Sequence, residues 1–386
     1  MNTRNIDIPF NRPPVIGTEA SALSEAVAQR QLGGDGPYTK YCEAWLAERL
    51  GAPRVALTQS CTDALEMAAL LLELGPGDEV IMPSYTFAST ATAVVLRGAT
   101  PVFADVVPGT MNIDVSEIES LIGPKTKAIF VVHYAGRVPD MDAINAIASS
   151  HGLTVVEDAA QSIGATYKGR PAGTHSALST LSFHASKNVI AGEAGALVIN
   201  TADYAERAFI LREKGTNRQS FMQGQVDKYT WVDLGSSFLP SDLVAAYLSC
   251  QLEAADVITE DRATSWNAYF DALAPAAEEF GIMLPDPVGP NHTLNGHIFH
   301  ILLPDAGYRE AFMSGMKVLG VHCSFHYVPL HSSPAGRRLG RAPSGCPTTE
   351  DCAARLVRLP LYYGMGQEAV GRSVAATIAT LSEIVS

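Results

Sequence analysis

Short apolar runs alternate with longer helical segments along the first part of the chain. The runs are uninterrupted instead of alternating between apolar and polar residues, which is typical of strands covered on both faces. Strands and helices that alternate in this way predict a mostly parallel sheet between layers of helices, an α/β fold. The predicted strands are Glu79–Pro83, Lys127–Val132, Thr154–Glu157, Ser179–Phe183 and Gly195–Ile199.

The pattern changes after Asp256 and predicts a second, smaller α/β unit. We expect a long helix over Asp261–Phe280, further helices near Tyr308–Leu319 and at the C-terminus, and a proline-rich loop after the first helix. The predicted strands of this part are Ile298–Leu303 and His322–Tyr327. The sequence therefore predicts a large domain over residues 1–256, with an N-terminal arm of about 30 residues, and a small domain over residues 257–386.

One lysine and one aspartate follow predicted strands of the large domain. Asp158 follows the strand Thr154–Glu157, and Lys187 comes shortly after the next strand, Ser179–Phe183. In parallel sheets, ligands bind beyond the carboxyl ends of the strands. Alone, such residues are usually a solvated lysine and a helix cap. Together they provide what pyridoxal phosphate requires: an amine that forms a Schiff base and an acid that keeps the pyridine nitrogen protonated.

A possible phosphate site lies at the start of a predicted helix. Ser60, Cys61 and Thr62 precede a run of good helix formers, so backbone amides and hydroxyls would face an anion there. Such residues are more often simple caps, but the lysine and the aspartate favour the cofactor's phosphate. Phe87 is a candidate to stack on the cofactor ring, and Gln161 to reach its hydroxyl.

Composition narrows the possible partners. The chain has 386 residues, is 47% hydrophobic and carries a net charge of −13. This charge leaves no basic patch for nucleic acid, so we expect no nucleic-acid partner. No stretch approaches the roughly 20 apolar residues that span a bilayer, and the N-terminus lacks the features of a signal peptide. We therefore expect no membrane partner and a cytoplasmic location.

The cysteines and histidines give no clear metal site. The six cysteines form no Cys-x-x-Cys pair, and we expect free thiols. His322, His326 and His331 could suggest metal ligands, but no carboxylate or thiolate stands at a helical spacing that would complete a site. We therefore expect no metal. These histidines, beside Tyr327, suit hydrogen bonding to a polar substrate equally well.

Several motifs, spread over nearly the whole chain, carry a resemblance to a known family. They are Gly75–Val80, Pro83–Phe87, Glu157–Gln161, Ser182–Asn188 and Gly192–Ala196. The chain closely resembles the DegT/DnrJ/StrS sugar aminotransferases, fold type I pyridoxal phosphate enzymes that aminate nucleotide-linked keto sugars. It looks most like the branch that makes TDP-4-amino-4,6-dideoxygalactose from TDP-4-keto-6-deoxyglucose. That closer resemblance lies in Pro9–Asn11, Gly34–Gly36, Arg212–Arg218, Gly224–Trp231 and His326–His331.

The resemblance implies a role for each cofactor residue. Lys187 would be the Schiff-base lysine, Asp158 would pair with the pyridine nitrogen, and Gln161 would approach the ring oxygen. The phosphate would be held around Ser60, Cys61, Thr62 and Ser182. Many members use an asparagine that crosses the dimer to the partner's cofactor phosphate, where this chain has the shorter Ser237. A second departure is Ala194, where glycine is usual and backbone freedom is greater.

The resemblance also implies the reaction. L-glutamate would convert the cofactor to pyridoxamine phosphate, and a TDP-linked 4-keto sugar would then take the amino group, in a homodimer with its active sites at the subunit interface. His326, Tyr327 and His331, with Lys228 from the second subunit, are candidate sugar contacts. A 4-keto pentose, a 3-keto sugar or, less favoured, dehydratase chemistry are alternatives. No arginine stands out in the sequence as the partner of the donor's carboxylate.

Overall fold

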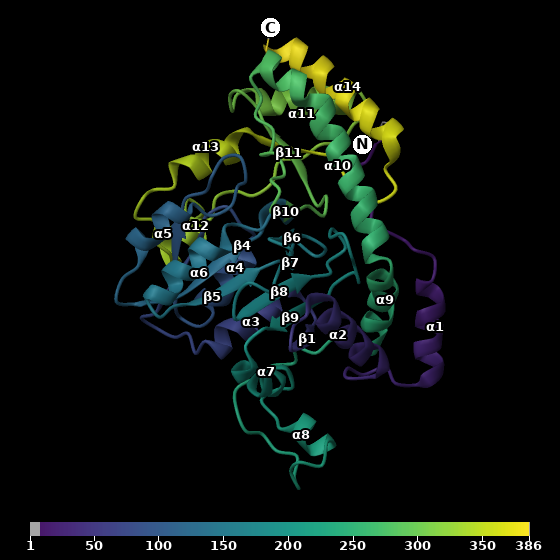
Figure 1. Cartoon of the computed structure of the whole chain (residues 1–386), viewed down its shortest axis with the longest axis vertical. Helices are drawn as coiled ribbons and strands as arrows, with labels where there is room; N and C mark the ends of the chain where they lie inside the picture. Colours follow the sequence, from purple (N-terminus) through teal and green to yellow (C-terminus); the bar gives the residue numbers. More distant parts are fainter. Residues whose placement is uncertain (1–7, 386) are drawn as a thin grey trace.

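The computed structural model describes residues 8–385, so the first seven residues of the expected N-terminal arm lie outside the described residues. At its centre lies a seven-stranded sheet in the order β1-β9-β8-β5-β4-β2-β3 (Figure 1). Neighbouring strands pair in parallel except for β9, which is antiparallel to both β8 and β1. The strands are β1 (Arg54–Thr58), β2 (Glu79–Pro83), β3 (Thr100–Ala104), β4 (Thr126–Val132), β5 (Thr154–Asp158), β8 (Leu178–Ser182) and β9 (Gly195–Ile199). The predicted α/β fold is confirmed.

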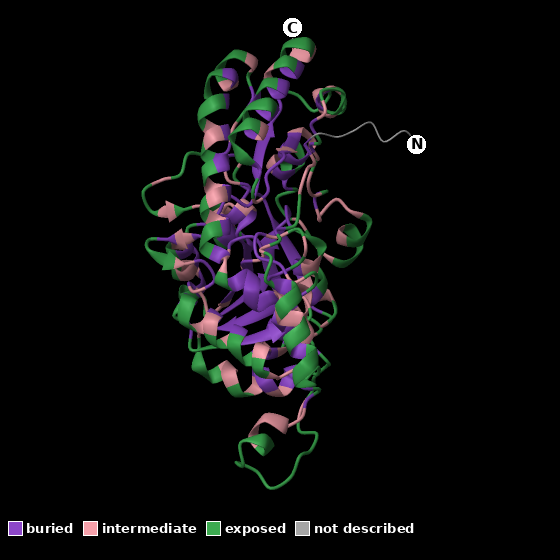
Figure 2. Ribbon diagram, turned by 90° about the vertical axis from the view of Figure 1, so that its right-hand side faces the viewer, coloured by how far each residue is buried: buried purple, intermediate pink, exposed green. Residues whose placement is uncertain are grey.

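Helices cover both faces of this sheet, which explains the uninterrupted apolar runs. In β9, Leu197 packs into the core under α3 (Cys61–Leu71) and α4 (Ala88–Val95), whereas its neighbour Val198 packs under the opposite layer. That layer contains α2 (Pro37–Leu50) and α9 (Asp242–Glu253), while α5 (Val115–Leu121) and α6 (Met141–Ser150) cover β3 and β5. Because successive strand residues face opposite sides, both must be apolar. Buried residues accordingly concentrate on the sheet (Figure 2).

The C-terminal part has its own apolar core. The long helix α10 (Ala255–Phe280) lies beside α14 (Gly366–Val385), and both pack with α11 (Tyr308–Val318) around the two-stranded sheet of β11 (Phe299–Leu302) and β12 (Leu356–Leu359). The predicted helices are confirmed, although α10 begins earlier than expected. The domain boundary at residue 256 stays a prediction.

The predicted strand over His322–Tyr327 is wrong. Only a single bridge forms there, between Ser324 and Arg358. The next carbonyl, that of Phe325, accepts hydrogen bonds from the Arg358 side chain at 3.0 and 3.2 Å and not from a strand backbone. A side chain therefore interrupts the ladder, and the segment continues as a loop.

The remaining elements are short or peripheral. They are α1 (Glu19–Gln29), η1 (Tyr134–Gly136), β6 (Thr166–Tyr167), β7 (Arg170–Pro171), η2 (Ala202–Tyr204), α7 (Ala205–Arg212), α8 (Arg218–Met222), β10 (His292–Thr293), α12 (Pro334–Leu339) and α13 (Pro347–Arg355). Residues 213–237, which contain α8, project away from the sheet and are called the protruding segment below. Within residues 8–385, every helix is too short or too polar to cross a membrane.

Candidate active site

A cavity of about 760 Å³ lies at the carboxyl ends of the parallel strands. This volume is in the range of small-molecule sites, roughly 300–1,000 Å³. Segments from both halves of the chain line it. The predicted site residues that meet at this cavity are Ser60, Cys61, Thr62, Phe87, Asp158, Gln161, Ser182, Lys187, His326 and Tyr327.

Lys187 and Asp158 face the same cavity from neighbouring strand ends. Burial lowers the pKa of the Lys187 amine; Cys61 and Asp158 oppose this shift, and the positive charge of Arg358 adds to it. Burial raises the pKa of the Asp158 carboxyl, which Thr90 and Lys187 partly offset. An amine with a lowered pKa spends more time as the neutral base, which proton transfer requires.

Hydrogen bonds fix the Asp158 carboxylate. Thr90 Oγ1 donates to its Oδ2 at 2.7 Å, and the backbone N–H of Ala160 reaches its Oδ1 at 3.3 Å. Thr90 is fully buried on α4, and its hydroxyl lies 2.9 Å from that of Thr86. Thr90 was not predicted as a site residue, although its place one helical turn after Thr86, beside a predicted strand end, is a signal in the sequence.

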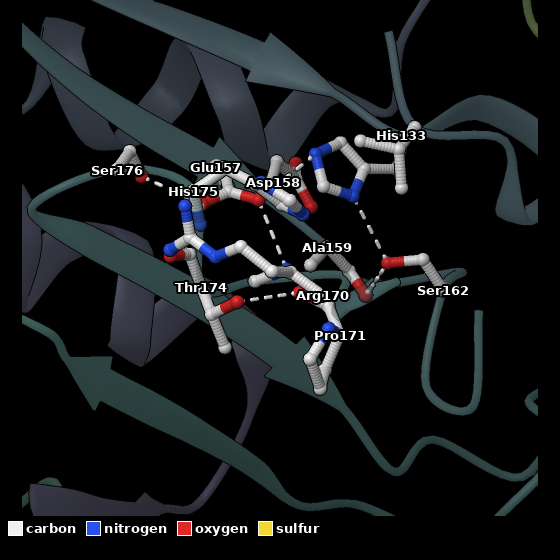
Figure 3. A network of polar contacts seen from close by, with 12 residues as sticks. His133, Glu157, Asp158, Ala159, Ser162, Arg170, Pro171, Thr174, His175 and Ser176 are labelled. Carbon is white, nitrogen blue, oxygen red and sulfur yellow. Dashed lines mark hydrogen bonds and ion pairs between the residues drawn. The ribbon is translucent and has the colours of Figure 1, made fainter. Parts of the chain in front are cut away.

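A buried polar network surrounds Glu157, the residue before Asp158 on β5 (Figure 3). Because successive strand residues face opposite sides, Glu157 and Asp158 belong to different faces of the sheet. Glu157 is fully buried and accepts hydrogen bonds of 2.8–2.9 Å from the backbone of Gly173 and His175 and from Ser176 Oγ. His133 Nε2 lies 3.2 Å from Glu157 Oε2 in a contact that is electrostatic and not a well-aligned hydrogen bond. Burial opposes ionisation of Glu157, but the contacts with His133 and Ser176 outweigh it and lower its pKa.

The start of α3 forms one corner of the cavity, lined by Ser60, Cys61 and Thr62. Ser60 caps the helix by accepting a hydrogen bond from the Asp63 N–H at 3.1 Å, and the Thr62 hydroxyl lies 2.7 Å from that of Ser89. The first residue of β9, Gly195, passes so close that a Cβ on it would lie 2.4 Å from the Cys61 backbone nitrogen. Gly195 is therefore the glycine that this corner requires. Ala194 beside it does not adopt a positive φ.

A chain of hydrogen bonds links the two halves of the cavity wall. Gln161 Nε2 donates to Tyr327 Oη at 2.9 Å, and Gln161 Oε1 accepts from the Ala135 N–H at 2.7 Å. The Tyr327 ring stacks on His326 with centroids 3.6 Å apart, and His326 Nδ1 lies 2.8 Å from Tyr134 Oη. The amide of Gln161 is thus oriented by contacts at both of its ends.

Three predicted site residues do not line this cavity. His331 lies outside it, with Nδ1 2.6 Å from Ser84 Oγ and Nε2 3.3 Å from Glu350. Lys228 and Ser237 are exposed on the protruding segment. Within the described residues, no group of three or more histidines, cysteines or carboxylates is arranged to hold a metal ion.

Four residues that were not predicted from the sequence also line the cavity: two arginines, Arg262 and Arg358, and two aromatic residues, Phe10 and His297. Arg262 is 2% exposed and donates to the carbonyls of Gly296 and His297, which ties α10 to that loop. Burial lowers its pKa to about 10. Phe10 lies in the stretch Pro9–Asn11 that carries the closer resemblance but was given no role there, and no motif marks the other three residues. Arg358 stands alone among the apolar residues of β12, and a charged residue in such a run indicates a functional role.

The fold, a mostly parallel sheet with helices on both faces and a smaller C-terminal α/β unit, is that of fold type I pyridoxal phosphate enzymes. Residues 14–378 match the DegT/DnrJ/EryC1/StrS aminotransferase family. This chain therefore belongs to that family and is a pyridoxal-phosphate-dependent sugar aminotransferase.

Individual relatives are similar to this chain over most of its length. A pleiotropic regulatory protein of Geobacillus stearothermophilus is 34% identical over 335 residues, 86% of each chain. The dTDP-4-dehydro-2,3,6-trideoxy-D-glucose 4-aminotransferase of Saccharopolyspora spinosa is 31% identical over 370 residues, 94% of each chain. The crystal structure of the aminotransferase TlmJ from Streptoalloteichus hindustanus has a TM-score of 0.89 and 31% identity, covering 98% of this chain and 100% of that one.

Proposed function

We propose that this enzyme moves the amino group of L-glutamate to C4 of a TDP-linked 4-keto sugar, with TDP-4-keto-6-deoxyglucose as the first candidate. The observation that carries the proposal is that Lys187 and Asp158 face one cavity beside the start of α3. The relative from S. spinosa, named as a 4-aminotransferase of a dTDP sugar, supports the choice of acceptor.

The cavity residues fit pyridoxal phosphate chemically. Helix amides and the hydroxyls of Ser60 and Thr62 suit a phosphate, while Asp158 suits a protonated ring nitrogen. Cys61 and Ser182 would complete the phosphate corner, Gln161 would contact the ring oxygen, and Phe87, 60% exposed at the cavity, would cover the ring. These assignments follow from the chemistry of the donor set.

Lys187 would carry the proton transfers. The bound cofactor supplies an electron sink for the carbanion that forms next to the transferred nitrogen. Lys187 Nζ would accept the proton from the α-carbon of the amino donor and pass it to the cofactor carbon; in the second half-reaction it would move a proton from that carbon to the sugar carbon. Its lowered pKa favours the neutral amine that the first step needs. Asp158, held by Thr90, would pair as an ionised carboxylate with the protonated ring nitrogen.

We also propose a homodimer in which the protruding segment packs on the second copy. This segment exposes several large apolar side chains, with Trp231 75% and Met222 68% exposed, and monomers rarely leave such surface uncovered. Lys228 and Ser237 lie on it, away from this chain's own cavity. In a dimer they would serve the partner's cavity, Ser237 at the cofactor phosphate and Lys228 at the sugar nucleotide.

Mixing two inactive variants tests this arrangement. Lys187→Ala removes the amine of a subunit's own site, and Lys228→Ala removes the residue offered to the partner. A mixed dimer then contains one site with both residues intact, so mixing and reassembly should restore up to about a quarter of the wild-type activity. If the mixture stays as inactive as its parents while mixed dimers form, Lys228 does not act across the interface.

Acceptors related to the proposed one remain alternatives. A 4-keto pentose or a 3-keto sugar would use the same residues, and one methyl group in a pocket changes selection by only about 1–3 kcal/mol. Dehydratase chemistry is disfavoured because Lys187 is present and lines the cavity.

The absorbance of the purified holoenzyme tests both half-reactions. Glutamate should replace the pyridoxal phosphate band by that of pyridoxamine phosphate, and TDP-4-keto-6-deoxyglucose should restore it. If glutamate acts but this sugar does not restore the band, the acceptor is wrong, and keto pentoses and 3-keto sugars are tried next. If the protein with added cofactor shows no band, the roles of Lys187 and of the whole cavity are wrong.

A further inference from the structure

Arg358 is a cation that faces the cavity. Its Nε and Nη2 donate to the Phe325 carbonyl at 3.2 and 3.0 Å, and its guanidinium carbon lies 4.6 Å from the ring centroid of Phe10. Within residues 8–385, no carboxylate forms an ion pair with it. A partly buried guanidinium without a counter-ion is costly, so the protein retains a free anion-binding group here.

The groups around Arg358 do not neutralise it. Burial raises the pKa of the Tyr134 and Tyr327 hydroxyls and lowers the pKa of the His297 and His326 imidazoles, so that all four are neutral near pH 7. The two carboxylates that line the cavity are engaged elsewhere. Asp158 accepts hydrogen bonds from Thr90 and Ala160, and Glu193 lies 3.4 Å from His184.

The other lining arginine, Arg262, is not equivalent. Its Nε and Nη2 each donate to a different backbone carbonyl, and its side chain is almost completely buried. Arg358 is half-buried, and both of its hydrogen bonds go to one carbonyl at one edge of the guanidinium. That carbonyl and the Phe10 ring hold the group in place and leave donors directed at a ligand.

The position of Arg358 near Lys187 distinguishes between two possible anions. Arg358 and Lys187 line the same cavity, and the positive charge of Arg358 adds to the burial that lowers the pKa of the Lys187 amine. In an amino acid, the α-carboxylate is bonded to the same carbon as the transferred nitrogen. In a nucleotide sugar that reacts at C4, the nearest phosphate is attached at C1, across the sugar ring. An anion that binds next to the reacting amine therefore fits the amino donor better than the diphosphate.

We propose that Arg358 binds the α-carboxylate of the amino donor and so selects an amino acid in the first half-reaction. This inference rests on the proposed function only in requiring an amino-acid donor; it does not depend on which keto sugar accepts the amine. The keto sugar carries no carboxylate at the corresponding carbon, so the Phe325 carbonyl and the Phe10 ring keep Arg358 in place while the sugar is bound.

Equilibrium binding gives a readout that does not need turnover. 2-Methylglutamate lacks the α-hydrogen and cannot complete the reaction, so calorimetry on the holoenzyme measures its dissociation constant directly. Arg358→Gln should raise this constant about tenfold to hundredfold, the value of a lost charged hydrogen-bond pair. Arg358→Lys keeps the charge but loses the paired N–H donors of the guanidinium, so its dissociation constant should lie between those of the wild type and Arg358→Gln. The exposed Arg338→Gln on α12 is the matched control and should bind as the wild type does.

The two half-reactions, followed separately, identify the anion. In Arg358→Gln the rate with glutamate should fall, whereas the rate with 4-aminobutyrate, which is glutamate without its α-carboxylate, should change little. Pyridoxamine-phosphate-loaded enzyme should still react with the keto sugar at close to the wild-type apparent affinity. Thermal unfolding and the cofactor absorbance check that the variant is folded and loaded.

Other outcomes would overturn the assignment. A loss confined to the keto-sugar half-reaction would place the diphosphate at Arg358, and an equal loss with 4-aminobutyrate would place the distal carboxylate there. Unchanged binding of 2-methylglutamate would exclude any contact with the donor. A wild-type enzyme that responds to glutamate but not to the proposed sugar would refute only the acceptor, whereas one that responds to no amino acid would refute both proposals.

Discussion

Thr90→Val removes the hydrogen bond that holds Asp158, together with the contact between the Thr90 and Thr86 hydroxyls. Valine keeps the shape of threonine, so the substitution removes the 2.7 Å bond from Thr90 Oγ1 to Asp158 Oδ2 without opening a cavity. A hydrogen bond to a buried charged group contributes about 1.5–3 kcal/mol. Because this bond stabilises the ionised carboxylate, its loss should raise the pKa of Asp158 further.

The effect on the cofactor follows from the same shift. A protonated pyridine nitrogen pairs with ionised Asp158, so a higher carboxyl pKa in the cofactor-free protein should weaken cofactor binding by about tenfold to hundredfold at low pH. As the pH rises above the pKa in both proteins, Asp158 is ionised in both, and the deficit should narrow. Titration of the cofactor-free enzyme with pyridoxal phosphate, at several pH values, measures this difference.

Two variants on the same helix serve as controls. Thr90→Ser keeps the hydroxyl and should restore most of the affinity, whereas Thr92→Val changes an exposed threonine of α4 and should have no effect. The reasoning is refuted if Thr90→Val binds the cofactor as tightly as the wild type at every pH. It is also refuted if the deficit grows with rising pH.

Two further substitutions test the surroundings of the site. Glu157→Gln should lower the free energy of unfolding at neutral pH by about 3 kcal/mol, because it breaks the buried contact with His133. Since the pKa of Glu157 is lowered in the folded protein, this contribution should be lost as the pH falls through that lowered pKa. Urea unfolding at several pH values measures it. A difference in unfolding free energy between wild type and variant that stays the same at every pH would contradict this. Gly195→Ala should displace the start of α3, lower the free energy of unfolding by about 1–3 kcal/mol and weaken cofactor binding. Gly75→Ala, whose Cβ would meet open space, should be tolerated. Equal melting temperatures for both variants would rule out the proposed crowding at Cys61.

The site residues that the sequence could predict are those that follow the ends of predicted strands. Asp158 and Lys187 follow apolar runs whose continuity reveals a sheet covered on both faces, so their convergence at one edge follows from topology. The edge strand β3 was not predicted, because Pro101 argues against a strand except at an edge, where a missing N–H is tolerated. Arg358 was missed for another reason: the packing of β12 brings it to the cavity that Lys187 lines, and no spacing along the chain encodes that tertiary arrangement.

The reversed direction of β9 has a consequence for how Lys187 is held. β9 runs antiparallel to β8, so it begins at the same end of the sheet at which β8 ends. The connection between them, residues 183–194, therefore stays at that end, whereas a connection between parallel strands must return to the opposite end. Lys187 lies on this loop, and the two ends of the loop are anchored in the adjacent buried strands β8 and β9. Amino acids within the loop can therefore be exchanged during evolution without displacing the amine, whereas an insertion or deletion there would move it relative to Asp158. Homologous enzymes of this family should tolerate length changes in other loops around the cavity more readily than in this one.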